Sequence, residues 1–160
     1  SITSNKPIVV NTGNATGGAG PNPGNGTSGQ DFNLDQIVPV DKVGTEYIVV
    51  KGNGSNDSEF PLVIATEDNT EIFVNGSTTP YNVINQGEFL TIPSVFYQGG
   101  ASANMYIESS KPVYVYQVLA GSTNDATSGL NFIPPLSCFF QKNVDLIPDI
   151  NRIGNTFFSI

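Results

Sequence analysis

The clearest strand pattern in the chain is Pro112-Val113-Tyr114-Val115-Tyr116-Gln117-Val118-Leu119. β-Branched and aromatic residues alternate along it, and both types are enriched in strands. Since successive side chains of a strand point to opposite faces, Val113, Val115 and Leu119 are placed on the core side. The run therefore predicts a central strand of a sheet.

Outward from this run, short apolar runs alternate with turn residues, and no helical period of 3.6 residues is visible. The dipeptides Asp68-Asn69 and Asn75-Gly76 are typical of tight reversals between antiparallel strands. We predict an all-β fold of antiparallel sheets packed face to face, as one β-sandwich-like unit or as two small β units. The further predicted strands are Pro7–Asn11, Thr45–Lys51, Pro61–Ala65, Thr70–Asn75, Glu88–Ile92, Ala103–Glu108, Leu130–Phe132, Phe139–Leu146 and Asn155–Ile160, and the central one extends over Pro112–Ala120.

Composition favours an extracellular protein. Only 12% of the residues are charged, so solubility rests on Asn, Ser, Thr and Gly, which is more common in secreted β proteins than in cytosolic enzymes. The 14 acidic residues outnumber the 6 basic ones and give a net charge of -8, which repels a nucleic-acid backbone. No run approaches the roughly 18 apolar residues that span a bilayer. We predict an extracellular or cell-surface location, no nucleic-acid partner and no membrane insertion.

The chemistry available to the chain is narrow, because it contains no His and a single Cys. The lack of His removes the Ser-His and Cys-His dyads and the usual zinc ligands. Cys138 stands among Phe residues and is interpreted as a small buried hydrophobe. Carboxylate pairs such as Asp31 and Asp35 resemble glycosidase pairs, but they lie in predicted turns, where Asp bonds its own backbone. We predict no catalytic residue, no cofactor and no enzyme activity.

Calcium is the one metal for which the loops offer candidate ligands. Asp57 and Glu59 lie in the oxygen-rich segment 53–59, and Asp125 lies in another polar segment. Carboxylate and carbonyl oxygens are the groups that calcium binds. However, the spacing matches no EF-hand, and loops of Asn, Gly and Ser turn without an ion. The sequence therefore gives Asp57, Glu59 and Asp125 as weak calcium candidates.

Two segments have almost nothing to bury. Residues 12–29 consist mainly of Gly, Asn, Pro, Ser and Thr, and a weaker version of this composition occupies residues 120–129. Such composition is typical of exposed loops or linkers. The first segment comes directly after the predicted strand Pro7–Asn11, and the second comes directly after the central strand. This shared order of strand and polar segment suggests an internal repeat.

The repeat can be followed residue by residue. Residues 2–10 read Ile-Thr-Ser-Asn-Lys-Pro-Ile-Val-Val, and residues 107–115 read Ile-Glu-Ser-Ser-Lys-Pro-Val-Tyr-Val. Residues 35–44 resemble residues 145–154 in the same way, each with an Asp, a Pro, a basic residue and a closing Gly. We predict an internal repeat of about 105 to 110 residues.

This repeat divides the chain into a first unit at 1–111 and the start of a second, incomplete unit at 112–160. The boundary falls between Lys111 and Pro112, where Pro fixes φ at the first position of a strand and Lys protects an exposed edge. Both ends of the chain have strand-like sequences, so we expect a segment of a longer polypeptide whose neighbouring repeats are its partners.

The segments 107–117 and 65–70, together with Asn75-Gly76 and the copy at 2–10, resemble the IgGFc-binding protein N-terminal domain family. The resemblance covers nearly all of the chain. It implies a component of very long surface or secreted bacterial proteins, often from Bacteroidetes and exported by a type IX system, and it carries no catalytic motif. The loop at 12–29 is interpreted as a local elaboration of the family pattern.

Three hypotheses for the function remain, each from a different class of protein. The first is a non-catalytic adhesin module, whose loops at 14–29, 53–59 and 121–129 contact an extracellular glycan or protein. The second is a structural spacer or a filament subunit in which repeats stack. The third is an accessory carbohydrate-binding module, with Phe96 and Tyr97 as aromatic platforms at a loop tip, although adjacent aromatics are more often one core and one surface residue.

Five Asn-x-Ser/Thr sites are also present, and in Asn-rich loops such sites arise easily by composition. A suitable host could attach glycans at them. The sites are Asn14, Asn25, Asn53, Asn56 and Asn75.

Overall fold

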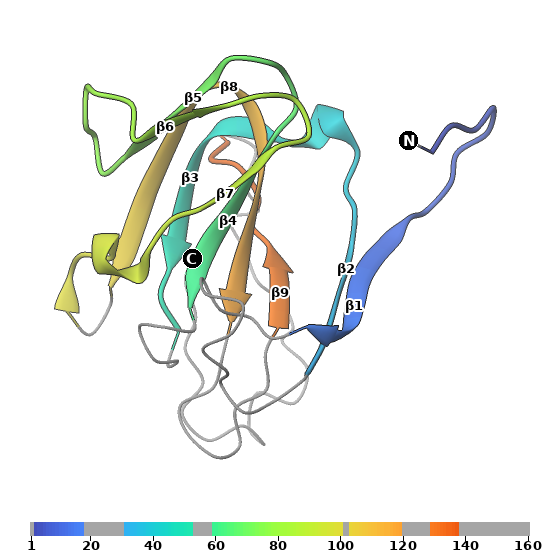
Figure 1. The fold of residues 1–160 in the computed structure, drawn as a ribbon, viewed down its shortest axis with the longest axis horizontal. Coiled ribbons are helices and arrows are strands. Elements are labelled where there is room, and N and C mark those ends of the chain that lie inside the picture. Colours follow the sequence, from blue (N-terminus) through green and yellow to red (C-terminus); the bar gives the residue numbers. More distant parts are fainter. Residues whose placement is uncertain (1, 18–30, 53–58, 101–102, 120–128, 138–160) are drawn as a thin grey trace.

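The computed structural model describes residues 2–17, 31–52, 59–100, 103–119 and 129–137 (Figure 1). Within these residues the chain forms strands and two short 3-10 helices, which confirms the predicted all-β class. The helices are η1 (Val40–Lys42) and η2 (Ser94–Phe96). The strands are β1 (Asn11–Gly17), β2 (Asp31–Gln36), β3 (Gly44–Val50), β4 (Phe60–Ala65), β5 (Thr70–Val74), β6 (Asn82–Ile84), β7 (Phe89–Thr91), β8 (Asn104–Leu119) and β9 (Gly129–Phe132).

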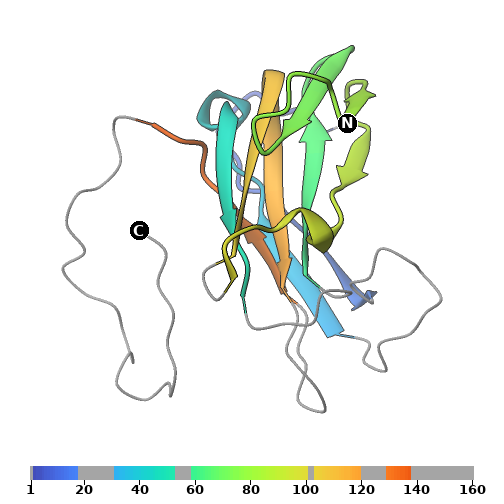
Figure 2. The ribbon, with the colours of Figure 1, turned by 90° about the vertical axis from the view of Figure 1, so that its left-hand side faces the viewer.

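Strand β8 is the centre of the fold, which confirms the prediction of a central strand. Its first half pairs antiparallel with β3 on one side and β5 on the other. Its second half pairs antiparallel with β4 and β9. Figure 1 shows β8 rising through one layer and returning through the other as an arch, and in Figure 2 it lies between β3 and β4. One long strand therefore runs through both layers of a single seven-stranded sheet, with the order β6-β5-β8-β4-β7 and with β3 and β9 also paired to β8.

The arch bends at residues 109–112. Pairing with β3 jumps there from Glu108 to Val113, which leaves a wide bulge in β8. Pro112 has no N–H to donate, so it suits a position where the ladder is interrupted. The sequence analysis was wrong on this point: it placed Lys111-Pro112 at the start of a strand with an exposed edge, whereas the pair lies inside one continuous central strand.

A buried tyrosine holds this bend against β3. The side chain of Tyr47 is fully buried, and its hydroxyl donates to the carbonyl of Val113 at 2.5 Å. The same hydroxyl accepts a hydrogen bond from the amide of Gly44 at 2.8 Å. Tyr47 therefore satisfies backbone groups of both strands at the place where their regular ladder is broken.

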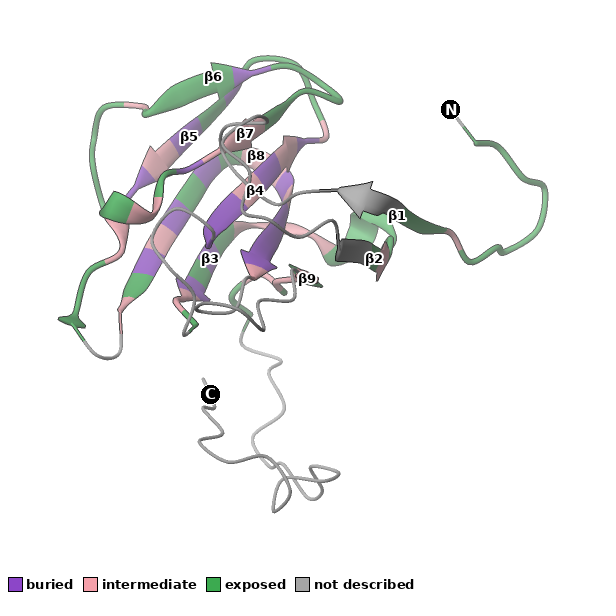
Figure 3. Ribbon diagram, turned by 60° about the horizontal axis from the view of Figure 1, so that its bottom comes forward, coloured by how far each residue is buried: buried purple, intermediate pink, exposed green. Residues whose placement is uncertain are grey.

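The inner faces of the two layers enclose one hydrophobic core. Alternate residues of β8 point into it, among them Met105, Ile107, Val113 and Val115, all 0% exposed. Figure 3 shows this alternation as buried and exposed bands along the strands. The core also contains Tyr47, Val49, Val63, Ala65, Ile72, Val74, Ile84 and Ile92. The predicted sandwich-like arrangement of antiparallel sheets is thus confirmed.

Strands β1 and β2 form a separate two-stranded hairpin beside this body. The carboxylate of Asp35 joins the two parts, because it accepts a hydrogen bond from the amide of Phe132 in β9 at 2.8 Å. The hydroxyl of Tyr114 donates to the carbonyl of Val38 at 2.9 Å. The hairpin is therefore fixed to the outer face of the sheet that contains the second half of β8.

This hairpin corrects three predictions. Residues 12–17 were predicted as the start of an exposed loop, but they lie in β1. Asp31 and Asp35 were placed in a turn, but they lie in β2. The strand predicted at Pro7–Asn11 is extended chain up to the first residue of β1. The polar residues of this hairpin give little strand signal.

The predicted strands Phe139–Leu146 and Asn155–Ile160, like Cys138, lie outside the described residues. The division of the chain at residue 111 into two repeat units stays a prediction. Strand β8 runs through this position.

Packing around Gly44 gives a first testable prediction. A Cβ atom at Gly44 would lie 2.7 Å from Cβ of Pro135, in the segment where Leu136 donates to the carbonyl of Glu46 at 2.7 Å. Gly44→Ala is expected to lower the free energy of unfolding by about 1–3 kcal/mol through overpacking. Urea denaturation measures it. Gly129→Ala is the control, because its Cβ would be in ordinary contact at 3.8 Å, and an equal loss there would contradict the explanation.

Candidate functional site

Several strand ends meet at one end of the fold. Gly17 pairs with Asp31, and Leu119 pairs with Gly129, so the residues that flank segments 18–30 and 120–128 are neighbours in each hairpin. The start of β4 reaches the same end, because Phe60 pairs with Val118. Figure 1 shows these strand ends together at the bottom of the view. We call this end of the fold the loop end.

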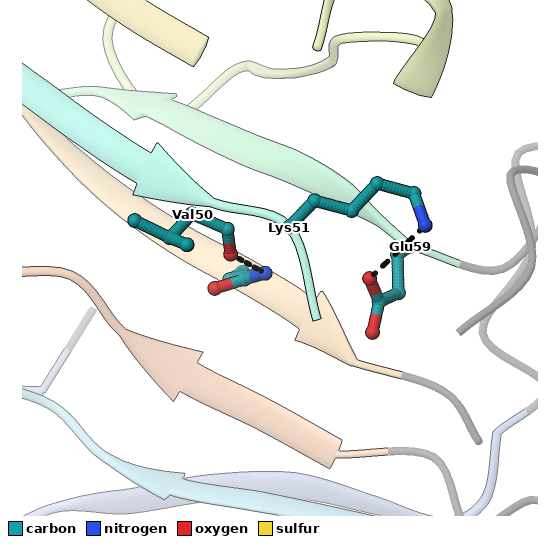
Figure 4. A network of polar contacts seen from close by, with 4 residues as sticks. Val50, Lys51 and Glu59 are labelled. Atoms are coloured by element: carbon teal, nitrogen blue, oxygen red, sulfur yellow. Dashed lines mark hydrogen bonds and ion pairs between the residues drawn. The ribbon is translucent and has the colours of Figure 1, made fainter. Parts of the chain in front are cut away.

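A buried ion pair supports the loop end. Glu59, the residue before β4, is 1% exposed. Its Oε2 lies 3.9 Å from Nζ of Lys51, whose side chain is 18% exposed. Figure 4 shows the lysine extending across to the carboxylate. Because a buried carboxylate needs a compensating charge, this contact holds together the two chain segments that flank residues 53–58.

Two further side chains complete the polar cluster. Nε2 of the buried Gln117 donates to the carbonyl of Val50 at 2.6 Å, which joins β8 to the end of β3. The hydroxyl of Tyr97 is buried and lies near both Glu59 and Gln117. Burial, and after it the negative charge of Glu59, raises the pKa of Tyr97, and the side chain of Gln117 opposes this rise. We call Lys51, Glu59, Tyr97 and Gln117 the polar cluster.

The polar cluster positions backbone rather than a reactive group. Burial and the charge of Glu59 both favour the neutral form of Tyr97, and the carboxylate of Glu59 faces Lys51. Sequence analysis did not find this cluster as a unit. The available signal was Gln117, a polar residue inside an otherwise apolar run, since buried polar groups usually have a structural partner.

The buried tyrosines give a pH prediction. Burial raises the pKa of Tyr47 to about 12 from its usual 10.0. The folded state therefore favours the neutral phenol, so its contribution is complete below about pH 10 and is lost as the pH rises toward 12. We expect the urea midpoint to fall steeply above pH 10. In Tyr47→Phe the fall should be shallower, and equal slopes in the two proteins would contradict the assignment.

An apolar cavity of about 470 Å³ lies between the β1–β2 hairpin and the outer face of the sheet. Its lining residues come from β1, from the chain after β2, and from β4, β8 and β9. They are Thr12, Gly13, Ile37, Leu62, Ile64, Tyr114, Tyr116 and Leu130. The cavity marks the joint between the hairpin and the body of the fold.

The calcium candidates are only partly placed. Asp57 and Asp125 lie outside the described residues, and Glu59 faces Lys51 in the polar cluster. Over the residues that the structure describes, no group of three or more His, Cys, Asp or Glu side chains lies together as a metal site would need. A calcium site at Asp57, Glu59 and Asp125 stays a prediction.

The aromatic platform proposed at Phe96 and Tyr97 is not an open surface. Both side chains are half-buried and pack against the core. Phe96 also meets Tyr81 edge to face, with ring centroids 5.2 Å apart. The structure gives both residues a packing role, and a sugar platform at this place stays a prediction.

Asn75 is also used by the fold. Its φ of 55° and that of Gly76, 75°, confirm the predicted tight reversal. Its amide nitrogen donates to the carbonyl of Phe96 at 2.7 Å, and its amide oxygen accepts from Tyr106 at 3.1 Å. A glycan at Asn75 would disrupt this arrangement. Asn25, Asn53 and Asn56 lie outside the described residues, and Asn14 lies in β1.

The fold and the loop end together define a β-rich binding or structural module. The family model described as IgGFc binding protein matches residues 1–160, and the chain therefore belongs to the IgGFc binding protein family. No curated protein and no solved structure matches the chain. Within the described part of the chain there is no helix long and apolar enough to cross a membrane.

Proposed function

We propose that this chain is a non-catalytic binding module of an adhesin-type protein, and that its loop end contacts the partner. The observation that carries the proposal is the meeting of the strand ends that flank segments 18–30, 53–58 and 120–128. Binding residues collect on loops that a rigid sheet positions. The polar cluster ties together Lys51 and Glu59, on either side of one of these segments, and joins β8 to the end of β3.

The chemistry of the three segments suggests the class of partner. They are rich in Asn, Ser, Thr and Gly, which provide adaptable hydrogen bonds. With a net charge of -8, the chain suits an uncharged or basic partner and disfavours nucleic acid. We propose an extracellular glycan or protein, and the family description adds the Fc region of immunoglobulin G as a probe to be tested.

The cellular context is part of the same proposal. Composition and the family resemblance support a large bacterial protein that is secreted or displayed on the cell surface, in Bacteroidetes through type IX secretion. Neighbouring repeats of the same polypeptide would then be further partners.

The alternative function is a structural spacer or filament subunit. The local likeness between residues 2–10 and 107–115 favours it, because tandem units that pack end to end need no ligand. An accessory carbohydrate-binding role is weaker, since Phe96 and Tyr97 pack against the core.

The test is binding of the folded chain to an array of glycans, matrix proteins and Fc fragments. In one variant a short Gly-Ser linker replaces residues 18–30, and in a second it replaces residues 121–128. The control is Gln86→Ala, at the opposite end, which keeps the backbone N–H that donates to the carboxylate of Asp68. A signal lost in the loop variants and kept in the control supports the binding module. No signal from a folded protein overturns it in favour of the spacer.

A further inference from the structure

The segment before β1 exposes apolar side chains that the rest of the fold does not cover. Ile2 is 71% exposed, Ile8 is 54% exposed and Val9 is 70% exposed. Figure 1 shows this segment running away from the body before it enters β1. Apolar side chains that are exposed together in one segment mark a surface for packing against another part of a protein. These residues therefore indicate a packing partner.

The matching residues of β8 are fully buried. In the repeat, Ile2 corresponds to Ile107 and Ile8 corresponds to Val113. Ile107 and Val113 are both 0% exposed. Each has a paired strand on both sides, β3 and β5 for Ile107 and β3 and β4 for Val113. The same sequence pattern therefore occurs once inside a core and once outside any core.

The two segments also share a local conformation. In β8, the hydroxyl of Ser109 donates to the carbonyl of Lys111 at 2.8 Å, at the bend of the arch. In the first segment, the hydroxyl of Ser4 donates to the carbonyl of Lys6 at 2.8 Å, and the chain bends at that place. The same serine-to-lysine hydrogen bond is thus formed in both copies of the repeat.

Both bends lead into a hairpin. After its bend, β8 continues to Leu119 and pairs back with β9. After the bend at Lys6, the chain continues through β1 and pairs back with β2. The two hairpins lie next to each other, and the bond from Phe132 to Asp35 joins them.

We infer that residues 2–17 are the arched central strand of a second unit of this same fold, which precedes the described unit in the polypeptide. That unit would supply the counterparts of β3, β4 and β5 on both sides of the strand, and Ile2 and Ile8 would point into its core. The β1–β2 hairpin then belongs to the preceding unit and packs on the following one, so that consecutive units form a fixed joint. A second copy of this chain cannot play this role in trans, because β8 already occupies its sheets.

The first test makes residues 107–115 identical to residues 2–10 through E108T, S110N, V113I and Y114V. If the two segments are equivalent strands, the variant unfolds cooperatively, with a melting temperature lowered by less than about 8 °C. As control, the sequence of residues 2–10 replaces residues 106–114. This shift by one position turns the apolar side chains of the segment from the core to the outer face. The control is expected to lose cooperative unfolding. Loss of cooperative unfolding in the first variant as well would overturn the inference.

The second test supplies the missing strands. A second copy of residues 37–106 is fused directly before Ile2, in a C138S background, and Ile8→Cys is labelled with a thiol reagent in the fused protein and in the chain alone. Fusion is expected to slow labelling by roughly 100-fold or more, because Ile8 becomes core. Val95→Cys is the control, since Val95 is 81% exposed and should label equally fast in both.

Equal labelling of Ile8→Cys in the fused protein and the chain alone would overturn the inference. Slower labelling of the chain alone at higher protein concentration would indicate pairing between copies, and would overturn it too. Neither outcome depends on ligand binding, so both tests are independent of the array experiment.

Discussion

Replacing Lys51 by Met is expected to lower the free energy of unfolding by about 3–5 kcal/mol at pH 7. The substitution keeps the apolar stem of the side chain but leaves the carboxylate of Glu59, in a residue 1% exposed, without the lysine charge. Removing one member of a buried ion pair is costly, because the remaining charge stays desolvated. Urea denaturation followed by circular dichroism measures the loss.

Two further variants isolate this cause. Adding Glu59→Gln to Lys51→Met is expected to restore more than half of the lost stability, because the buried charge is removed. Lys42→Met is the matched control. Nζ of Lys42 lies 2.9 Å from Oδ2 of Asp41, but both side chains are 66% exposed. An exposed ion pair contributes little to stability, because water screens the attraction between its charges. If Lys51→Met costs no more than Lys42→Met, the polar cluster does not support the loop end.

Ile107→Ala is expected to cost about 2–5 kcal/mol, the range for removing a large buried aliphatic side chain. Ile107 is 0% exposed and lies in β8, where β3 and β5 pair on either side. Its repeat counterpart gives the comparison. Ile2→Ala should change the stability of the same chain by less than about 0.5 kcal/mol, since Ile2 is 71% exposed.

Chemical denaturation of both alanine variants tests the burial pattern of the two repeat copies. A cost for Ile2→Ala comparable to that of Ile107→Ala would show that residues 2–10 are already part of a core in this chain. A small cost for Ile107→Ala would contradict the central position of β8.

Much of the sheet could be predicted because its strands alternate. β5 and β7 fall within their predicted ranges, and β3, β4 and β9 each begin one residue before theirs. β1 and β2 were missed because Asn, Asp and Gly, which disfavour strands, dominate their sequences, and pairing in a hairpin overrides that preference. The break predicted at Lys111-Pro112 was wrong because local residue preferences do not show a bulge inside a long strand.

The site was harder to predict than the fold. Glu59 was identified as a calcium candidate from its polar neighbours in sequence, but its contact in space is Lys51. Gln117 and Tyr97 join them only because the arch of β8 and the turn after η2 bring distant parts of the chain together. Residues that are close only in space show no regular spacing in the sequence, so the polar cluster could not be predicted from it.

The arch of β8 also sets the order in which this protein can assemble. β3, β4 and β5 all pair with β8. Because the chain is synthesised from its N-terminus, these three strands are made before their shared partner at residues 104–119. Pairings of this kind are distant in sequence and slow to form. The unit is therefore expected to stay open while it is synthesised and to close in one late step, when its central strand arrives.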